Sequence, residues 1–117
     1  VTGLRSEKGN LRIAFYNTAE SFDNDQPALF NKTVSKSNIK NGVLKVSFSG
    51  LAPGTYGVAL LDDENANHKM DYRFFMPTEG FGFSDYYHTG MSRPKFNSFK
   101  FQLGAAPKKI NIRLRYL

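Results

Sequence analysis

A dense cluster of oxygen-bearing side chains follows a short apolar run in the stretch LLDDENANHKMDYRFF, residues 60–75. Carboxylate and amide oxygens at alternate positions of a tightly wound loop are ligands that Ca²⁺ prefers. Counted from the second Asp, such ligands occupy positions one, three, five, seven and nine of an EF-hand-like loop: Asp63, Asn65, Asn67, Lys69 and Asp71. At position seven the ligand would be the backbone carbonyl of Lys69. Calcium is therefore the candidate cofactor of this segment.

The second half of this loop departs from a calcium site. Position twelve, normally a bidentate acid, is Phe74, and position six, normally Gly, is His68. Glu79 or Asp85 could complete the ligand shell from further along the chain. Asn and Asp side chains also bond to nearby backbone N–H groups and so fasten irregular connections between strands. Both interpretations stay open; we favour the hydrogen-bonded turn, and we expect any calcium here to fasten the loop rather than to catalyse a reaction.

Aromatic residues crowd the same region: Tyr72, Phe74, Phe75, Phe81, Phe83, Tyr86 and Tyr87. Exposed rings would form a stacking surface for sugars or an anchor patch for a partner, whereas buried rings would close one end of the core. Burial is favoured for most of them, because each ring carries a large apolar surface. Tyr86 and Tyr87 are the expected exposed pair and, with Glu79, the predicted ligand-binding residues.

Residues suited to catalysis are few, and the chain contains no Cys. Two catalytic sets could be assembled from them. Ser84, Asp85 and His88 would form a hydrolytic set. Asp62, Asp63 and Glu79 would form a set of paired carboxylates. These residue types occur together by chance in many polar loops, and no nucleophile motif of known geometry is present. EGFGFS at 79–84 also lacks the third Gly and the following helix of a dinucleotide-binding motif. We expect no catalytic residues and no enzymatic activity.

The elements that must position these residues are strands, because apolar residues alternate with a period of two. Five strands are predicted, at residues 11–17, 43–50, 56–60, 99–103 and 109–116. A further strand at 1–4 would form a hairpin with the strand at 11–17, and a shorter one is predicted near 34–39. One short helix is predicted within 18–30, with Thr18 or Ser21 as its N-cap and Pro27 as its interruption.

Short strands separated by turns indicate an all-β protein, an antiparallel Greek-key β-sandwich of about seven strands. The length of 117 residues fits a single domain covering residues 1–117. Within it, the segment 62–97 is predicted as one long connection. Connections beyond about 12 to 15 residues are unusual in compact domains and are often functional, so any site is expected there.

The net positive charge of the chain gives a weaker indication of its binding partners. The 16 basic and 10 acidic residues give a net charge of +6, and Arg113 and Arg115 should point outward together on the last predicted strand. They could bind anionic lipid or a polyanion, but a solvated outer face is the favoured interpretation. Nucleic acid is not expected as a partner, because no nucleic-acid-binding module is present. No stretch approaches the roughly 20 apolar residues of a membrane-spanning helix.

Several short motifs, in their order along the chain, resemble the DUF2141 family, an uncharacterised bacterial group. They are Pro-Gly-Thr-Tyr at 53–56, Asp-Glu-Asn-x-Asn at 63–67 followed by Asp71, and Pro-x-Glu-Gly-x-Gly-Phe-Ser at 77–84. KGNLRIAFYN at 8–17 and RPKFNSFKFQL at 93–103 also resemble segments of that family, so the likeness covers nearly the whole chain. The chain departs from the family at His68, where Gly is usual.

The resemblance implies a setting and a fold rather than a reaction. The Leu-x-Pro-Gly-x-Tyr element at 51–56 is similar to one found in prealbumin (transthyretin)-like sandwiches, such as carboxypeptidase regulatory domains and surface-protein repeat modules. The family resemblance implies an exported protein, periplasmic or extracellular. The first residue, Val1, is not Met, so we expect that an upstream segment has been removed.

Together these observations predict a non-enzymatic domain that serves in binding or assembly at the bacterial cell envelope, with an envelope protein or a glycan as its partner. The alternative is a calcium-stabilised carbohydrate-binding module.

Overall fold

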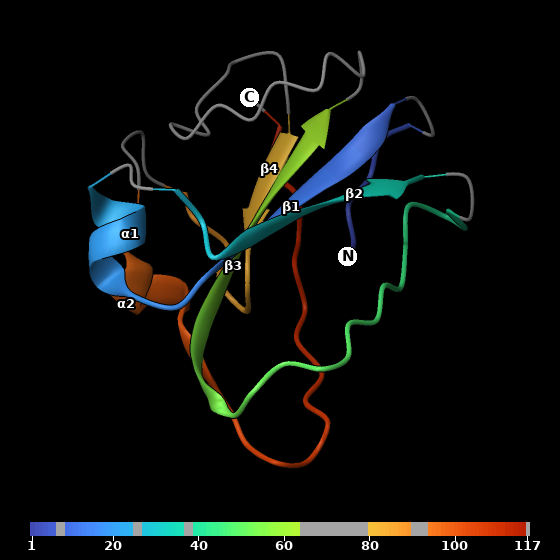
Figure 1. Ribbon diagram of the computed structural model, residues 1–117. Coiled ribbons are helices and arrows are strands. Elements are labelled where there is room, and N and C mark those ends of the chain that lie inside the picture. Colours follow the sequence, from blue (N-terminus) through green and yellow to red (C-terminus); the bar gives the residue numbers. More distant parts are fainter. Residues whose placement is uncertain (7–8, 25–26, 37–38, 64–79, 90–93, 117) are drawn as a thin grey trace.

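The computed structural model describes residues 1–6, 9–24, 27–36, 39–63, 80–89 and 94–116. Within these ranges it contains five strands: β1 (Asn10–Tyr16), β2 (Phe30–Ser35), β3 (Gly54–Asp63), β4 (Gly80–Phe83) and β5 (Phe101–Leu103). It also contains two short helices, α1 (Ala19–Asp23) and α2 (Phe96–Phe99). The strands pair antiparallel in the order β2-β1-β3-β4, and β5 pairs with the start of β3 (Figure 1). The predicted all-β class is confirmed.

The central strands β1 and β3 are buried on both faces. Alternate side chains of a strand point to opposite faces of the sheet. On β3, Ala59 and Leu61 pack into one apolar cluster, and Val58 and Leu60 pack into another. The half-buried strand predicted from the alternation is therefore covered on its second face as well, which leaves the sheet between two cores.

The first core lies under the two helices, which are adjacent in Figure 1. Thr18 caps α1, as predicted, because its hydroxyl oxygen accepts from the backbone N–H of Ser21 at 3.2 Å. Phe22 of α1 packs edge-on against Phe99 of α2, with ring centroids 4.8 Å apart. Below them, a Cβ at Gly57 would lie 2.7 Å from the nearest atoms of the two α2 phenylalanine rings, so the helix contacts β3 closely only because that residue is Gly.

The second core is covered by the two end segments of the chain and by residues 43–51. The backbone groups of Phe81 and Arg115 exchange two hydrogen bonds, which extends the sheet beyond β4. On the far side of this segment, Thr2 donates to the carbonyl of Ile112, and Leu44 donates to the carbonyl of Val1. The backbone pairing therefore continues from β4 through residues 112–115 and 1–4 to residue 44, and folds over the second core.

Two of the predicted strands are not confirmed by these contacts. In the described range 43–50 there is no regular strand, and the described part of 109–116 forms only isolated bridges, at Arg113 and Arg115. The apolar residues of these segments still face the core, since Leu44, Ile112 and Leu114 are buried. Each segment, however, forms too few backbone hydrogen bonds with its neighbours to make a regular β-ladder. The count of seven strands and the Greek-key sandwich are not confirmed.

Other boundaries are also shifted. The predicted hairpin between residues 1–4 and 11–17 is wrong, because β2 and β3 already occupy both edges of β1. The strand predicted near 34–39 begins earlier, at Phe30, and ends at Ser35, and β5 begins only at Phe101 because Phe99 ends α2. β4 lies inside the segment 62–97, which was expected to be one connection. This strand was not predicted because its glycines weaken the strand pattern.

Candidate functional site

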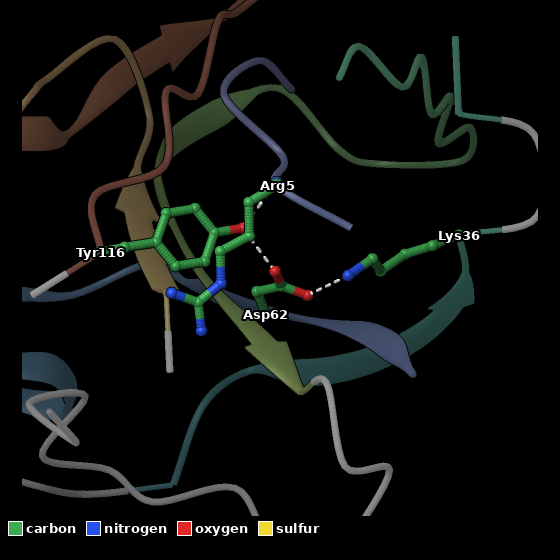
Figure 2. Close-up of polar contacts among 4 residues, drawn as sticks. All are labelled: Arg5, Lys36, Asp62 and Tyr116. Atoms are coloured by element: carbon green, nitrogen blue, oxygen red, sulfur yellow. Dashed lines mark hydrogen bonds and ion pairs between the residues drawn. The ribbon is translucent and has the colours of Figure 1, made fainter. Parts of the chain in front are cut away.

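A buried polar cluster joins the ends of β2 and β3 to the C-terminal segment (Figure 2). Lys36 Nζ lies 2.6 Å from Asp62 Oδ1, and both side chains are 0% exposed. The hydroxyl of Tyr116 donates to Asp62 Oδ2 at 2.5 Å. Arg5 closes the outer side, since its backbone N–H donates to the Tyr116 hydroxyl at 3.3 Å and its guanidinium carbon lies 4.2 Å from the centre of that ring.

Strand register explains why these residues meet. Leu11 of β1 lies between Val34 of β2 and Asp62 of β3, so Lys36, two residues after Val34, emerges near the same end of the sheet. Asp62 is paired with Gly80 of β4. A Cβ at Gly80 would overlap the ring of Tyr116, so the absent side chain leaves the space that the tyrosine occupies.

This cluster fits a structural role. Each carboxylate oxygen of Asp62 has a donor, and neither charged side chain reaches solvent. A general acid or base must come within hydrogen-bonding reach of a substrate. From the sequence, Asp62 was grouped only with Asp63 and Glu79. Its partners Lys36 and Tyr116 were missed, because they lie 26 and 54 residues away along the chain.

The predicted calcium ligands lie mostly outside the described residues. Asp63, the first of them, is fully buried at the end of β3, and it already takes part in an interaction. Asn65, Asn67, Lys69 and Asp71 lie outside the described residues, as does Glu79. Among the residues that are described, no three His, Cys, Asp or Glu side chains gather closely enough to hold a metal ion. The calcium site stays a prediction.

The residues considered for a hydrolytic set are held in separate contacts. The Ser84 hydroxyl is buried, donates to the Phe99 carbonyl at 2.6 Å, and accepts from the backbone N–H of Val58 at 3.1 Å. Asp85 Oδ1 accepts from the backbone N–H of Asn111 at 2.8 Å. The ring of His88 instead meets Tyr86, whose hydroxyl lies 3.2 Å from Nδ1. Ser84 and Asp85 thus connect backbone segments of the fold.

The two tyrosines predicted to be exposed differ from each other. Tyr87 is 38% exposed, and the guanidinium carbon of Arg113 lies 4.2 Å from its ring centre. Tyr86 is half-buried and packs against the core under the helices. Phe81 and Phe83, for which burial was favoured, are buried in that same core.

A groove opens on the other side of the sheet, between the face of β1 and β3 and two segments, 43–51 and 101–112. Its volume is about 970 Å³. Lys45, Lys108 and Lys109 belong to its lining, and all three are exposed. Burial, together with the nearby charge of Lys109, lowers the pKa of the Val1 amino group, which also lines the groove. The alternation of apolar residues in the segments 43–51 and 101–112 was visible in the sequence, but it predicted a filled core between two sheets rather than a groove.

The fold and these sites define an antiparallel β-sheet protein with helices over one face and a groove on the other. The chain belongs to the DUF2141 family, described as "uncharacterized protein conserved in bacteria", which it matches over residues 1–111. Membership in the family confirms the resemblance drawn from the sequence motifs. No curated protein and no solved structure matches the chain. No helix in the described part of the chain is both long and apolar enough to cross a membrane.

Proposed function

We propose that the chain is an exported, non-enzymatic domain that binds a ligand or partner at the bacterial cell envelope. The groove carries this proposal. Its volume of about 970 Å³ is in the range of small-molecule sites. Among the described residues that line it there is no Asp, Glu, His, Tyr or Cys, so this wall offers no carboxylate, imidazole, phenol or thiol for acid–base or nucleophilic chemistry. Binding without turnover is the activity such a surface supports.

The finer architecture belongs to the same proposal. A prealbumin-like Greek-key sandwich of about seven strands would place residues 43–50 and 109–116 in a second sheet above the groove. The alternating burial of Leu44, Ile112 and Leu114 supports this arrangement, as does the backbone pairing that continues beyond β4.

Native mass spectrometry tests the binding function. We expect that the protein, after incubation with a bacterial envelope extract, retains a bound species that is released with unchanged mass. Val43 lines the groove and is 40% exposed, so Val43→Glu should abolish retention without unfolding the protein. Leu29→Glu is the matched control, because Leu29 is 50% exposed and is not part of the groove lining. A released species that has been chemically converted would show an enzyme, and no retained species would contradict the proposal.

Export is supported by the family resemblance and is tested separately. Cells producing the full-length protein under its own start codon should release it with the periplasmic or outer envelope fraction. Recovery with cytoplasmic marker enzymes would contradict export while leaving the binding function in place.

A calcium-stabilised carbohydrate-binding module is the second candidate, and the exposed ring of Tyr87 favours it. Sugar rings stack on exposed aromatic faces. Binding on a glycan array that is lost in Tyr87→Ala would support this function, and a silent array would reject it. For the metal, a melting temperature that is the same with calcium and with chelator would reject calcium stabilisation.

A further inference from the structure

We propose that the groove binds a single-chain anionic lipid, with the acyl chain inside the groove and the anionic head group at the lysines of its margin. This inference rests on the proposed binding function and names the ligand class for the same site.

The interior of the groove suits an acyl chain. Its floor is the inward face of the two central strands, formed by buried apolar residues: Ile13, Phe15, Val58 and Leu60. Its walls carry Phe48 and Ile110, which pack against this core and remain partly accessible to solvent. The hydrated apolar surface therefore lies on these walls, and covering it with a ligand contributes favourable free energy.

The margin of the groove supplies the charge. Lys45, Lys108 and Lys109 are exposed, and none of them has an ion pair with another described residue. No carboxylate is found among the described lining residues to neutralise them. Lysine ammonium groups bind carboxylate or phosphate as compact charges, so the head group that matches this margin is anionic.

The form of the groove favours a lipid monomer over a sugar or a membrane surface. Sugar recognition needs many hydrogen-bonding side chains, and the described lining offers few besides its lysines: Thr2, Ser47, Ser49 and Asn111. A membrane surface would meet a flat or convex basic face, whereas this apolar surface lies between the sheet and two covering segments.

The test is a calorimetric titration of the whole chain with fatty acids of increasing length, kept below their micelle concentrations. Each added pair of methylene groups should lower Kd by roughly tenfold, if the chain is buried. Dodecanoate should bind more tightly than dodecanol, and dodecyltrimethylammonium should bind most weakly.

Two pairs of variants separate head-group from chain recognition. Lys108→Gln with Lys109→Gln should weaken dodecanoate binding by about three- to tenfold and leave dodecanol unchanged. Lys32→Gln with Lys95→Gln is the control, because it removes the same charge from exposed residues outside the groove. Val43→Glu should weaken binding of both ligands, while Leu29→Glu should weaken neither.

Three results would overturn the lipid assignment: no binding of dodecanoate, equal binding of the cationic amphiphile, or no dependence on chain length. Binding to phosphatidylglycerol vesicles without binding of the monomeric fatty acid would also overturn it. If native mass spectrometry still detects a neutral or cationic molecule that Val43→Glu displaces, the lipid assignment fails and the binding function stands. If nothing is retained in either experiment, both proposals fail.

Discussion

At the scale of single residues, the buried pair of Lys36 and Asp62 is the most consequential contact. Removing two charges from water costs several kcal/mol for each ion, and their attraction compensates only when the remaining groups are hydrogen-bonded. Here Tyr116 supplies the second donor to the carboxylate. The ion pair thus joins the ends of β2 and β3, and Tyr116 joins them to the C-terminal segment. The pair stabilises the fold only while all of these partners are present.

Breaking the pair on one side should be costly. Lys36→Met leaves the Asp62 carboxylate buried without its counter-charge, so we expect the free energy of unfolding to fall by about 3–5 kcal/mol. Replacing both residues, by Lys36→Met and Asp62→Leu, should restore most of that loss, because no charge is left unpaired. Urea denaturation of the wild type, of Lys36→Met, of Asp62→Leu and of the double variant measures the coupling between the two charges. Purely additive losses would show that the two charges are not coupled.

Gly80 provides a second prediction at this scale. A Cβ there would overlap the Tyr116 ring, so Gly80→Ala should displace the ring and weaken its hydrogen bond to Asp62. Overpacking of this kind typically costs about 1–3 kcal/mol. Gly104→Ala is the control, since a Cβ at Gly104 has no atom within 4 Å. Equal stability of the two variants in urea would contradict this packing.

At the scale of elements, α1 is only five residues long and depends on its cap and its tertiary contacts. A helix of this length is not stable alone in water. Thr18→Ala removes the acceptor for the Ser21 N–H and should lower the free energy of unfolding by about 1 kcal/mol. Thr18→Ser keeps that acceptor and should stay close to the wild type. A Thr18→Ala protein as stable as the Ser variant would mean that the cap contributes nothing.

The proposed second sheet is also an element-scale question. Leu44, Leu114 and Arg115 already donate backbone hydrogen bonds, so their amide protons should exchange slowly with solvent. If residues 43–50 form a sandwich strand, alternate amides beyond Leu44, such as that of Val46 or Phe48, should also be protected. Hydrogen exchange followed by NMR decides this. Protection that stops at Leu44 would leave the five-stranded arrangement without a second sheet.

At the scale of the whole molecule, the groove and the basic excess act together. A ligand that binds only the folded protein stabilises it by mass action, by about 2.7 kcal/mol at a concentration one hundred times its Kd. Dodecanoate at that ratio should therefore raise Tm, and added salt should reduce the effect by screening the lysines. A Tm that rises equally in Val43→Glu would place the binding elsewhere on the protein.

Much of the architecture is predictable because it depends on local patterns. The alternation of Ile13 and Phe15 with Ala14 and Tyr16 identifies β1. For α1 the sequence offered two N-caps, Thr18 and Ser21, and the first of them is the cap in the structure. Those signals come from a few neighbouring residues and from side-chain geometry that every strand or helix shares.

The candidate sites are much less predictable. Two consecutive acids, Asp62 and Asp63, look equivalent in the sequence, but successive side chains of a strand point to opposite faces of the sheet. The pairing of Asp62 with Lys36 could not be read from that position alone. The groove likewise depends on how closely residues 43–51 and 101–112 approach the sheet. The sequence by itself determined the family, the all-β class and the central strands, because periodicity and motifs are local. Only the tertiary structure decided that Asp62 pairs with Lys36 and that apolar segments border a groove, because those outcomes depend on register and distance between residues far apart in the chain.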